Sequence, residues 1–166
     1  MKKILISGGN GEFAKELQKH NTNYEIVAPS KKEMNITDTN ILENIIGTSN
    51  VVLTCIKYDI KLIYLSTDYV YPGINGNYNE DDYLKPFTNY GWSKLGGECA
   101  VRLYDNHLIL RLAMNKRPFP HPKALVDMKK SLMYIDDAVK VVSQLLDESG
   151  TINVGGKSQS VYDFVK

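Results

Sequence analysis

Cysteine and tryptophan are scarce in this chain: its 166 residues include two cysteines and one tryptophan. Two cysteines give no disulfide framework, and because Cys55 and Cys99 both lie in apolar stretches, we expect inert core thiols in a reducing cytosol. No apolar run reaches the ~18 residues of a membrane span, and the apolar N-terminus is too short for a signal peptide. These absences predict a cytoplasmic protein without a membrane segment, and the length predicts a single domain, residues 1–166.

An excess of charge of either sign is missing as well. The formal net charge is +1 at pH 7, and no stripe of basic and aromatic residues runs along the chain, so we expect no nucleic-acid partner. No set of histidine, cysteine and acidic residues has metal-ligand spacing, so we expect no metal site. The remaining composition agrees with an ordinary soluble enzyme domain.

The first motif is a glycine turn between an apolar run and a helical pattern. Residues 4–7 form the apolar run, and Phe13, Ala14 and Leu17 mark the inner face of a helix that begins near Gly11. The sequence GNGEFA fits G-x-G-x-x-A, whose glycines let the backbone approach a pyrophosphate at the positive N-terminus of a helix. The order of strand, glycine turn and helix favours a dinucleotide site over a turn without a ligand.

The residues after the second predicted strand, 25–28, indicate which dinucleotide is bound. An acidic residue about 20 positions past the glycines selects NAD by binding the ribose 2′-hydroxyl, but none occurs before Glu33. Ser30, Lys31 and Lys32 suit a 2′-phosphate instead. The sequence therefore favours NADP(H), with NAD(H) as the alternative, although paired lysines are also compatible with plain surface charge.

Three hydroxyl and amine side chains in the middle of the chain suggest proton transfer. Tyr90 and Lys94 are four residues apart, so on a helix they project from one face. An ammonium beside a phenol favours the phenolate, so we expect Lys94 to lower the pKa of Tyr90 below its usual value of about 10. Thr67, at the end of the apolar run KLIYLS, can hold the substrate oxygen to which Tyr90 passes a proton. The set predicts carbonyl–alcohol interconversion, although the Tyr–Lys pair alone also fits an ordinary helix surface.

Strand and helix patterns alternate along the chain, which predicts an α/β fold with a parallel sheet covered on both faces. The fold class that we expect is a Rossmann-type doubly wound parallel sheet with a small or reduced C-terminal substrate lobe, its elements around residues 113–135 and 155–166. The predicted strands are 4–7, 25–28, 51–55, 62–66, 107–112 and 151–154. The predicted helices are 41–46, 89–104, 135–146 and the one that begins near Gly11.

One part of this prediction conflicts with itself. Segments 51–55 and 62–66 both resemble buried parallel strands, yet only residues 56–61 separate them, and a parallel crossover needs about a dozen residues or more. Three explanations are open: a natural shortened variant, two segments that are not parallel neighbours, or residues missing from the sequence. We favour the last, because Tyr58 to Lys61 resembles the end of a helix that runs straight into its strand. The chain also stops inside a predicted helix that has just begun.

The chain resembles the extended short-chain dehydrogenases/reductases, and within them the dTDP-4-dehydrorhamnose reductase branch. The resemblance covers well over half of the chain in the order of the family, and STDYV followed by YGxSKLxGE is its most specific part. The matching stretches are ILISGGNGEFAKEL, EMNITD, KLIYLSTDYVYPG, YGWSKLGGE, MYIDDAVKVV and INVGGKSQSVYDF.

The resemblance implies a role for individual positions. Thr67, Tyr90 and Lys94 would be the catalytic triad, and Asp68 and Tyr69 would face the sugar. The cofactor-binding residues would be Gly8, Asn10, Gly11, Glu12, Phe13, Ser30, Lys31, Asn35, Ile36, Cys55 and Lys94. The family often supplies an aromatic residue to the sugar after the strand 107–112, and here that segment has none. Arg117 in the following loop is a candidate for the substrate diphosphate, with solvated loop charge as the alternative.

The function that these features predict is an NADP(H)-preferring reductase of a 4-keto nucleotide-deoxysugar, with Tyr90 as the acid. A nucleotide-sugar epimerase or dehydratase would use the same triad. A different class is a non-catalytic dinucleotide-binding homologue, such as the members of this branch that act as regulatory subunits of methionine adenosyltransferase. The expected partner is a small-molecule nucleotide sugar, and a homodimer is an open option.

Overall fold

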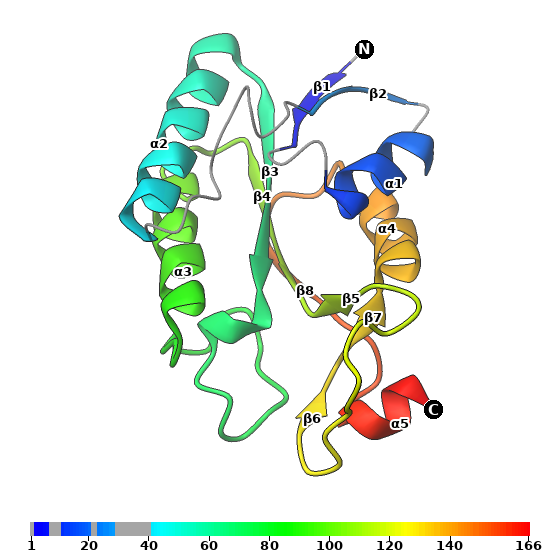
Figure 1. Ribbon diagram of the computed structural model, residues 1–166. Helices are drawn as coiled ribbons and strands as arrows, with labels where there is room; N and C mark the ends of the chain where they lie inside the picture. Colours follow the sequence, from blue (N-terminus) through cyan, green and yellow to red (C-terminus); the bar gives the residue numbers. More distant parts are fainter. Residues whose placement is uncertain (1, 7–10, 21–22, 29–40) are drawn as a thin grey trace.

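A five-stranded parallel sheet forms the centre of the computed structural model, which describes residues 2–6, 11–20, 23–28 and 41–166. The strands lie in the order β2-β1-β3-β4-β8, and every neighbouring pair is parallel (Figure 1). Their bounds are β1 (Lys2–Leu5), β2 (Tyr24–Val27), β3 (Lys61–Thr67), β4 (His107–Leu112) and β8 (Gly150–Val154).

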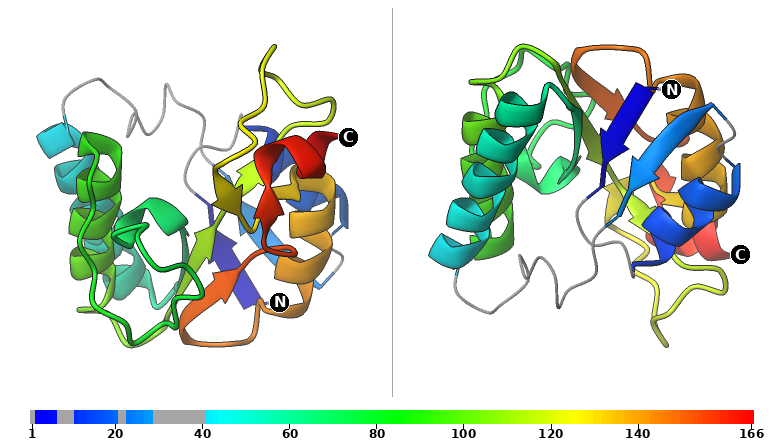
Figure 2. Two further views of the ribbon diagram at one scale, coloured as in Figure 1. Left: turned by 90° about the horizontal axis from the view of Figure 1, so that it is seen from below. Right: turned by 90° about the horizontal axis from the view of Figure 1, so that it is seen from above.

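Two helices cover each face of this sheet (Figures 1 and 2). On one face lie α1 (Glu12–His20) and α4 (Ile135–Gln144), and on the other α2 (Ile41–Tyr58) and α3 (Asn89–Val101). Each layer has its own apolar core, one built around Phe13, Leu17 and Val139 and the other around Cys55, Tyr64 and Val101. The fold class predicted from the sequence, a doubly wound parallel sheet, is confirmed.

The predicted strand 51–55 is wrong, because these residues form the second half of α2. A short apolar run fits a buried strand and a buried helix equally well, so its period did not distinguish them. In α2 the buried residues Thr48, Val51, Val52 and Cys55 recur at helical spacing. The interpretation of Tyr58 to Lys61 as the end of a helix running into its strand is confirmed, since α2 ends at Tyr58 and β3 begins at Lys61.

The conflict over the short crossover disappears with this correction. The two segments are not parallel neighbours, because one of them is helical. The connection between β2 and β3 contains the 18-residue α2, and β3 pairs directly with β1 through Ile4 opposite Lys61 and Leu5 opposite Leu62. A parallel crossover of the usual kind, with a helix on the sheet, is therefore present.

Short elements gather at the carboxyl ends of the strands (Figure 1). We call them the C-terminal lobe: β5 (Met114–Asn115) paired with β7 (Met133–Tyr134), β6 (Lys129–Lys130) paired with β9 (Gln159–Ser160), and α5 (Val161–Val165). A small apolar core of Ala113, Leu132 and Val161 holds the lobe together. Within the described residues, no helix is both long enough and apolar enough to cross a bilayer.

Candidate active site at the carboxyl ends of the strands

The order in which the chain adds strands to the sheet reverses between β1 and β3. From β1 the chain continues through α1 to β2 on one side, and the later strands β3, β4 and β8 lie on the other. Open α/β sheets bind ligands at such a switch point, outside the carboxyl ends of the strands. The end of β1 leads to the glycine turn, and the end of β3 is Thr67.

The described part of the glycine motif agrees with a dinucleotide site. Gly11 and Glu12 are exposed at the N-terminus of α1, while Phe13 and Ala14 are buried in the core and hold the helix against the sheet. The Phe13 side chain is therefore part of the core, and only its backbone remains for a ligand. The other predicted cofactor residues of this region, Gly8, Asn10, Ser30, Lys31, Asn35 and Ile36, lie outside the described residues.

A cleft of about 450 Å³ opens between the end of β3 and the C-terminal lobe. Thr67, Asp68, Tyr69 and Tyr90 line it from the side of the sheet and α3. The lobe side contributes Phe119, His121, Lys123, Met128 and Lys130, among others. Two of the three predicted triad residues and both predicted sugar-facing residues thus share one cleft.

Thr67 is the last residue of β3 and directly precedes the short 3-10 helix η1 (Asp68–Val70). Its hydroxyl accepts a hydrogen bond from the Tyr69 backbone N–H at 3.3 Å, which caps η1. The same hydroxyl donates a hydrogen bond to Asp68 Oδ1 at 3.3 Å. The residue is 5% exposed. Because both neighbours hold it, the hydroxyl has a fixed position at the floor of the cleft.

Tyr90 projects from the first turn of α3. Thr88 caps this helix by accepting a hydrogen bond from the Gly91 N–H at 3.0 Å. A Cβ on Gly91 would lie 2.5 Å from the Tyr69 carbonyl oxygen, so only glycine lets the helix start this close to η1. The Tyr90 and Tyr69 rings meet edge to face, with centroids 6.1 Å apart. This contact holds the phenol beside Thr67 and Asp68.

The pKa of Tyr90 is raised, which contradicts the expectation that Lys94 lowers it. Burial of the phenol is the largest cause, and hydrogen bonding with the Thr67 side chain opposes it. Lys94 is not among the causes of this shift, and its ammonium lies over the Tyr64 ring, 4.2 Å from the centroid. Burial lowers the pKa of Lys94 itself to about 8, and the nearby Glu98 opposes this shift.

Two predicted binding residues lie away from this cleft. Cys55 is a core residue of α2 with no exposed surface, and burial raises the pKa of its thiol to about 11. Its assignment to the cofactor stays a prediction. Arg117 is not among the residues that line the cleft. It lies beside Asp136 and Asp137 at 3.6 and 3.2 Å and over the Tyr134 ring at 3.8 Å. Of the two cysteines expected in the core, Cys99 is exposed, so that expectation is wrong for Cys99.

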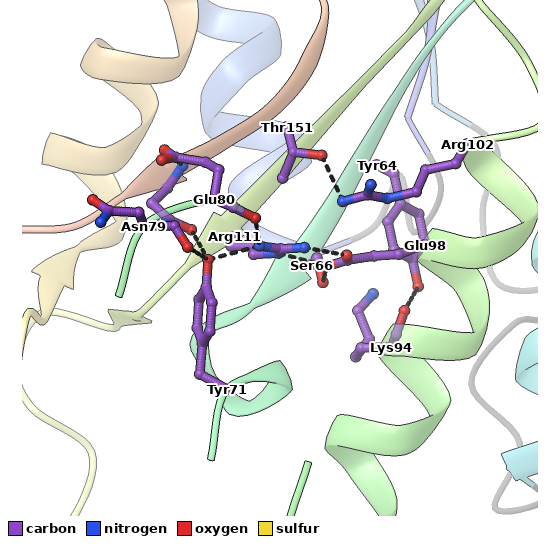
Figure 3. Close-up of polar contacts among 11 residues, drawn as sticks. Tyr64, Ser66, Tyr71, Asn79, Glu80, Lys94, Glu98, Arg102, Arg111 and Thr151 are labelled. Carbon is purple, nitrogen blue, oxygen red and sulfur yellow. Dashed lines mark hydrogen bonds and ion pairs between the residues drawn. The ribbon is translucent and has the colours of Figure 1, made fainter. Parts of the chain in front are cut away.

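A buried ion pair, which the sequence reasoning missed, ties α3 to the sheet (Figure 3). Arg111 on β4 donates from Nη2 to Glu98 Oε2 at 2.8 Å and from Nε to Glu98 Oε1 at 3.1 Å, with side chains 1% and 0% exposed. Ser66, the residue before Thr67, donates to Glu98 Oε1 at 2.5 Å. Arg111 Nη1 also donates to the Tyr71 hydroxyl at 2.6 Å.

This network has one sequence signal. An arginine inside the apolar strand HLILRL needs a buried partner, because charged side chains are almost never fully buried alone. The sequence does not say which acid supplies it. Glu98, on the helix that carries Tyr90 and Lys94, is the partner. The ion pair therefore fixes α3 relative to the carboxyl ends of β3 and β4.

The parallel sheet, its two helical layers and the cleft at the strand ends define a Rossmann-type α/β protein. Residues 42–143 match the family described as the RmlD substrate binding domain, and the chain belongs to that family. The predicted resemblance to the dTDP-4-dehydrorhamnose reductase branch is thereby confirmed.

Individual relatives agree with this assignment. The spore coat polysaccharide biosynthesis protein SpsK of Bacillus subtilis is 32% identical over an alignment of 139 positions that covers 62% of this chain and 49% of that protein. The dTDP-4-dehydrorhamnose reductase of Aggregatibacter actinomycetemcomitans is 27% identical over 149 residues, 67% of this chain and 51% of that protein. The chain thus spans about half the length of the curated relatives that it matches.

A solved structure shows the same fold. The dTDP-4-dehydrorhamnose reductase of Bacillus anthracis, in complex with NADP, superposes with a TM-score of 0.83 at 24% identity. The match covers 99% of this chain and 79% of that chain.

Proposed function

We propose that the protein is an NADP(H)-preferring reductase of a 4-keto nucleotide-deoxysugar, acting as a single domain of residues 1–166. The observation that carries the proposal is the cleft in which Thr67 and Tyr90 lie beside Asp68 and Tyr69. The cleft adjoins the switch point of the sheet, where α/β proteins bind nucleotides. Membership of the RmlD family, and relatives named as dTDP-4-dehydrorhamnose reductases, support the substrate class.

The dinucleotide would lie along the carboxyl ends of β1 and β3. The exposed N-terminus of α1, with Gly8, Asn10, Gly11 and Glu12, would hold its pyrophosphate. Ser30 and Lys31 would bind the 2′-phosphate, and Asn35 and Ile36 would flank the adenine. When bound, NADPH supplies a hydride. One solved relative is in complex with NADP, which supports this proposal, and others are in complex with NAD, so the preference for NADP(H) rests on Ser30 and Lys31.

The residues of this chain would manage the proton. Reduction of a carbonyl to an alcohol adds a hydride to the carbon and a proton to the oxygen. The raised pKa of Tyr90 keeps the phenol protonated at neutral pH, which is the form that a proton donor needs. Thr67 would orient the carbonyl oxygen from its fixed position at the cleft floor. Lys94, with a pKa of about 8, stays mostly charged at neutral pH and would bind the nicotinamide ribose.

Replacement of the phenol tests this assignment. Tyr90→Phe should keep NADPH binding and lose turnover by roughly 10²–10⁴-fold, because only the proton donor is removed. Turnover is measured as loss of NADPH absorbance with dTDP-4-dehydrorhamnose, and binding by NADPH fluorescence. Tyr83→Phe, at a 63% exposed tyrosine that does not line the cleft, is the matched control. Turnover of Tyr90→Phe equal to that of the wild type would remove Tyr90 from the mechanism.

A second candidate is a dinucleotide-binding protein without chemistry. The position of the Lys94 ammonium over the Tyr64 ring, instead of beside Tyr90, favours this alternative. NADPH binding with no NADPH consumption on dTDP-4-dehydrorhamnose would support it. A nucleotide-sugar epimerase or dehydratase would convert the sugar without net NADPH consumption, which analysis of the sugar product distinguishes.

A further inference from the structure

Lys130 reaches the cleft from the C-terminal lobe. Its Nζ lies 2.7 Å from Asp68 Oδ2, and it also lies over the Tyr69 ring, 3.9 Å from the centroid. Asp68 and Tyr69 directly follow Thr67, so a residue 62 positions later in the chain contacts both proposed sugar-facing side chains. Thr67, Asp68, Tyr69 and Tyr90 come from β3, η1 and α3, and Lys130 contacts two of them from the lobe.

The backbone of Lys130 has a defined position. The strand β6 pairs antiparallel with β9, with Lys129 opposite Ser160 and Lys130 opposite Gln159. Val161 adds a hydrogen bond from its N–H to the Met128 carbonyl at 3.0 Å. Successive side chains of a strand point to opposite sides, and accordingly the Lys130 side chain is 17% exposed in the cleft while Lys129 is exposed.

The two oxygens of Asp68 have different partners. Oδ2 faces the Lys130 ammonium at 2.7 Å, and Oδ1 lies 3.3 Å from the Thr67 hydroxyl. The ammonium over the Tyr69 ring adds a cation–π contact, which is stronger where water is partly excluded. A single side chain therefore restrains the carboxylate next to Thr67 and the ring next to Tyr90.

We propose that Lys130 is a specificity-determining residue of the cleft, acting as a positioning residue that holds Asp68 and Tyr69 where they meet the sugar. The inference rests on the proposed function, because the ligand class is a nucleotide sugar. Lys130 acts through Asp68 and Tyr69 and not on the reacting atoms, so its loss changes how well the sugar binds more than how fast the bound sugar reacts.

The test compares Lys130→Met, Lys130→Arg and Lys129→Met in the full chain. Methionine keeps the length of the stem and removes the charge, and Lys129→Met makes the same change on the same strand but away from the cleft. For Lys130→Met we expect KM for dTDP-4-dehydrorhamnose to rise about tenfold, equivalent to the loss of one good polar contact. The kcat should change by less than about threefold. Lys130→Arg should recover most of the affinity, and Lys129→Met should match the wild type.

Calorimetric binding of dTDP-rhamnose without NADPH separates this inference from the proposed function. If the wild type binds dTDP-rhamnose but shows no turnover, the reductase proposal fails. The dissociation constants of the variants still test whether Lys130 positions Asp68 and Tyr69. A tenfold weaker Kd for Lys130→Met that disappears in an Asp68→Asn background supports positioning through Asp68. Three results would overturn the inference. The first is an equal affinity of Lys130→Met and Lys129→Met for dTDP-rhamnose, and the second is that Lys130→Met and Asp68→Asn weaken binding additively. The third is that the wild type does not bind dTDP-rhamnose. Thermal unfolding of each variant identifies any that fail to fold.

Discussion

Tyr90 and Lys94 lie one helical turn apart, and loss of hydration is the largest cause of both pKa shifts, although the Tyr90 residue as a whole is 53% exposed. Removal from water disfavours the charged form, so it raises the pKa of the Tyr90 phenol and lowers that of the Lys94 ammonium. The Lys94 ammonium lies over the Tyr64 ring, and it is not among the causes that shift the pKa of Tyr90. The spacing of the pair was correct, but the direction of the lysine side chain depended on Tyr64, which comes from a neighbouring strand.

The lowered pKa of Lys94 predicts a stability that depends on pH. The folded pKa of about 8 lies below the unfolded value of about 10.4, so the unfolded chain holds this proton more tightly. The buried ammonium therefore costs stability at every pH below about 8, and this cost disappears as the pH rises from about 8 to about 10.4. At pH 7 we expect Lys94→Met to be more stable than the wild type by about 1–3 kcal/mol in urea unfolding.

The comparison over pH makes this prediction specific. The advantage of Lys94→Met should shrink steadily between pH 8 and pH 10, whereas Lys129→Met, at an exposed lysine of β6, should show no such trend. A constant difference between Lys94→Met and the wild type across this range would mean that the lysine is not desolvated.

At the scale of elements, the position of α3 depends on the ion pair between Glu98 and Arg111. The helix carries Tyr90 and Lys94, while Arg111 belongs to β4 and Ser66 to β3, so three elements meet at one carboxylate. Breaking a buried pair by removing one partner is strongly destabilising, since it leaves an uncompensated charge away from water. Replacing both partners by apolar residues is often far less costly.

We therefore expect Arg111→Met to lower the free energy of unfolding by about 3–5 kcal/mol. The double variant Glu98→Leu with Arg111→Met should lose less than Arg111→Met alone, because no unpaired charge remains buried. Arg102→Met serves as the control: its guanidinium contacts Thr151 in an exposed position at 3.2 Å, and such contacts are worth about 1 kcal/mol or less. Urea unfolding measures all three. Equal losses for Arg111→Met and Arg102→Met would contradict a stabilising role for the buried pair.

Several elements could be predicted from sequence periodicity, and α2 shows why others could not. The strand 107–112 is confirmed as β4, and the predicted helices from residues 89 and 135 are confirmed as α3 and α4. In all three, the period of the apolar residues or the residues that flank the element indicate its type clearly. The segment 51–55 has neither, because a short and mostly apolar run is buried equally well in a helix on a sheet or in a strand within it.

At the scale of the whole molecule, the site is assembled from distant parts of the chain. β1 and β3 are neighbours at the switch point of the sheet, and Lys130 of the C-terminal lobe contacts Asp68, the residue that follows β3. A ligand bound at this junction would contact parts of the chain that are distant in sequence. Binding to the folded state alone stabilises a protein by an amount set by ligand concentration and affinity.

The proposed cofactor should accordingly raise the melting temperature. NADPH at 100 times its dissociation constant should add about 2.7 kcal/mol, which for a domain of this size corresponds to a rise of roughly 5–10 °C. NADH at the same concentration should give a smaller rise, and a Ser30→Ala, Lys31→Ala double variant should reduce the advantage of NADPH. Equal rises with NADH and NADPH would remove the preference for NADP(H), and no rise with either would remove the dinucleotide site.

The fold class and the family follow from the sequence alone, which also places Thr67 at the end of a strand and Tyr90 at the start of a helix. These features rest on local patterns: glycine spacing, apolar periodicity and the STDYV and YGxSKLxGE stretches. Only the tertiary structure decided that α2 is one long helix, that Glu98 neutralises Arg111, that Lys94 faces Tyr64, and that Lys130 holds Asp68. Each of these depends on which distant side chain fills a partly buried position, and burial and pairing of that kind are properties of the packed molecule.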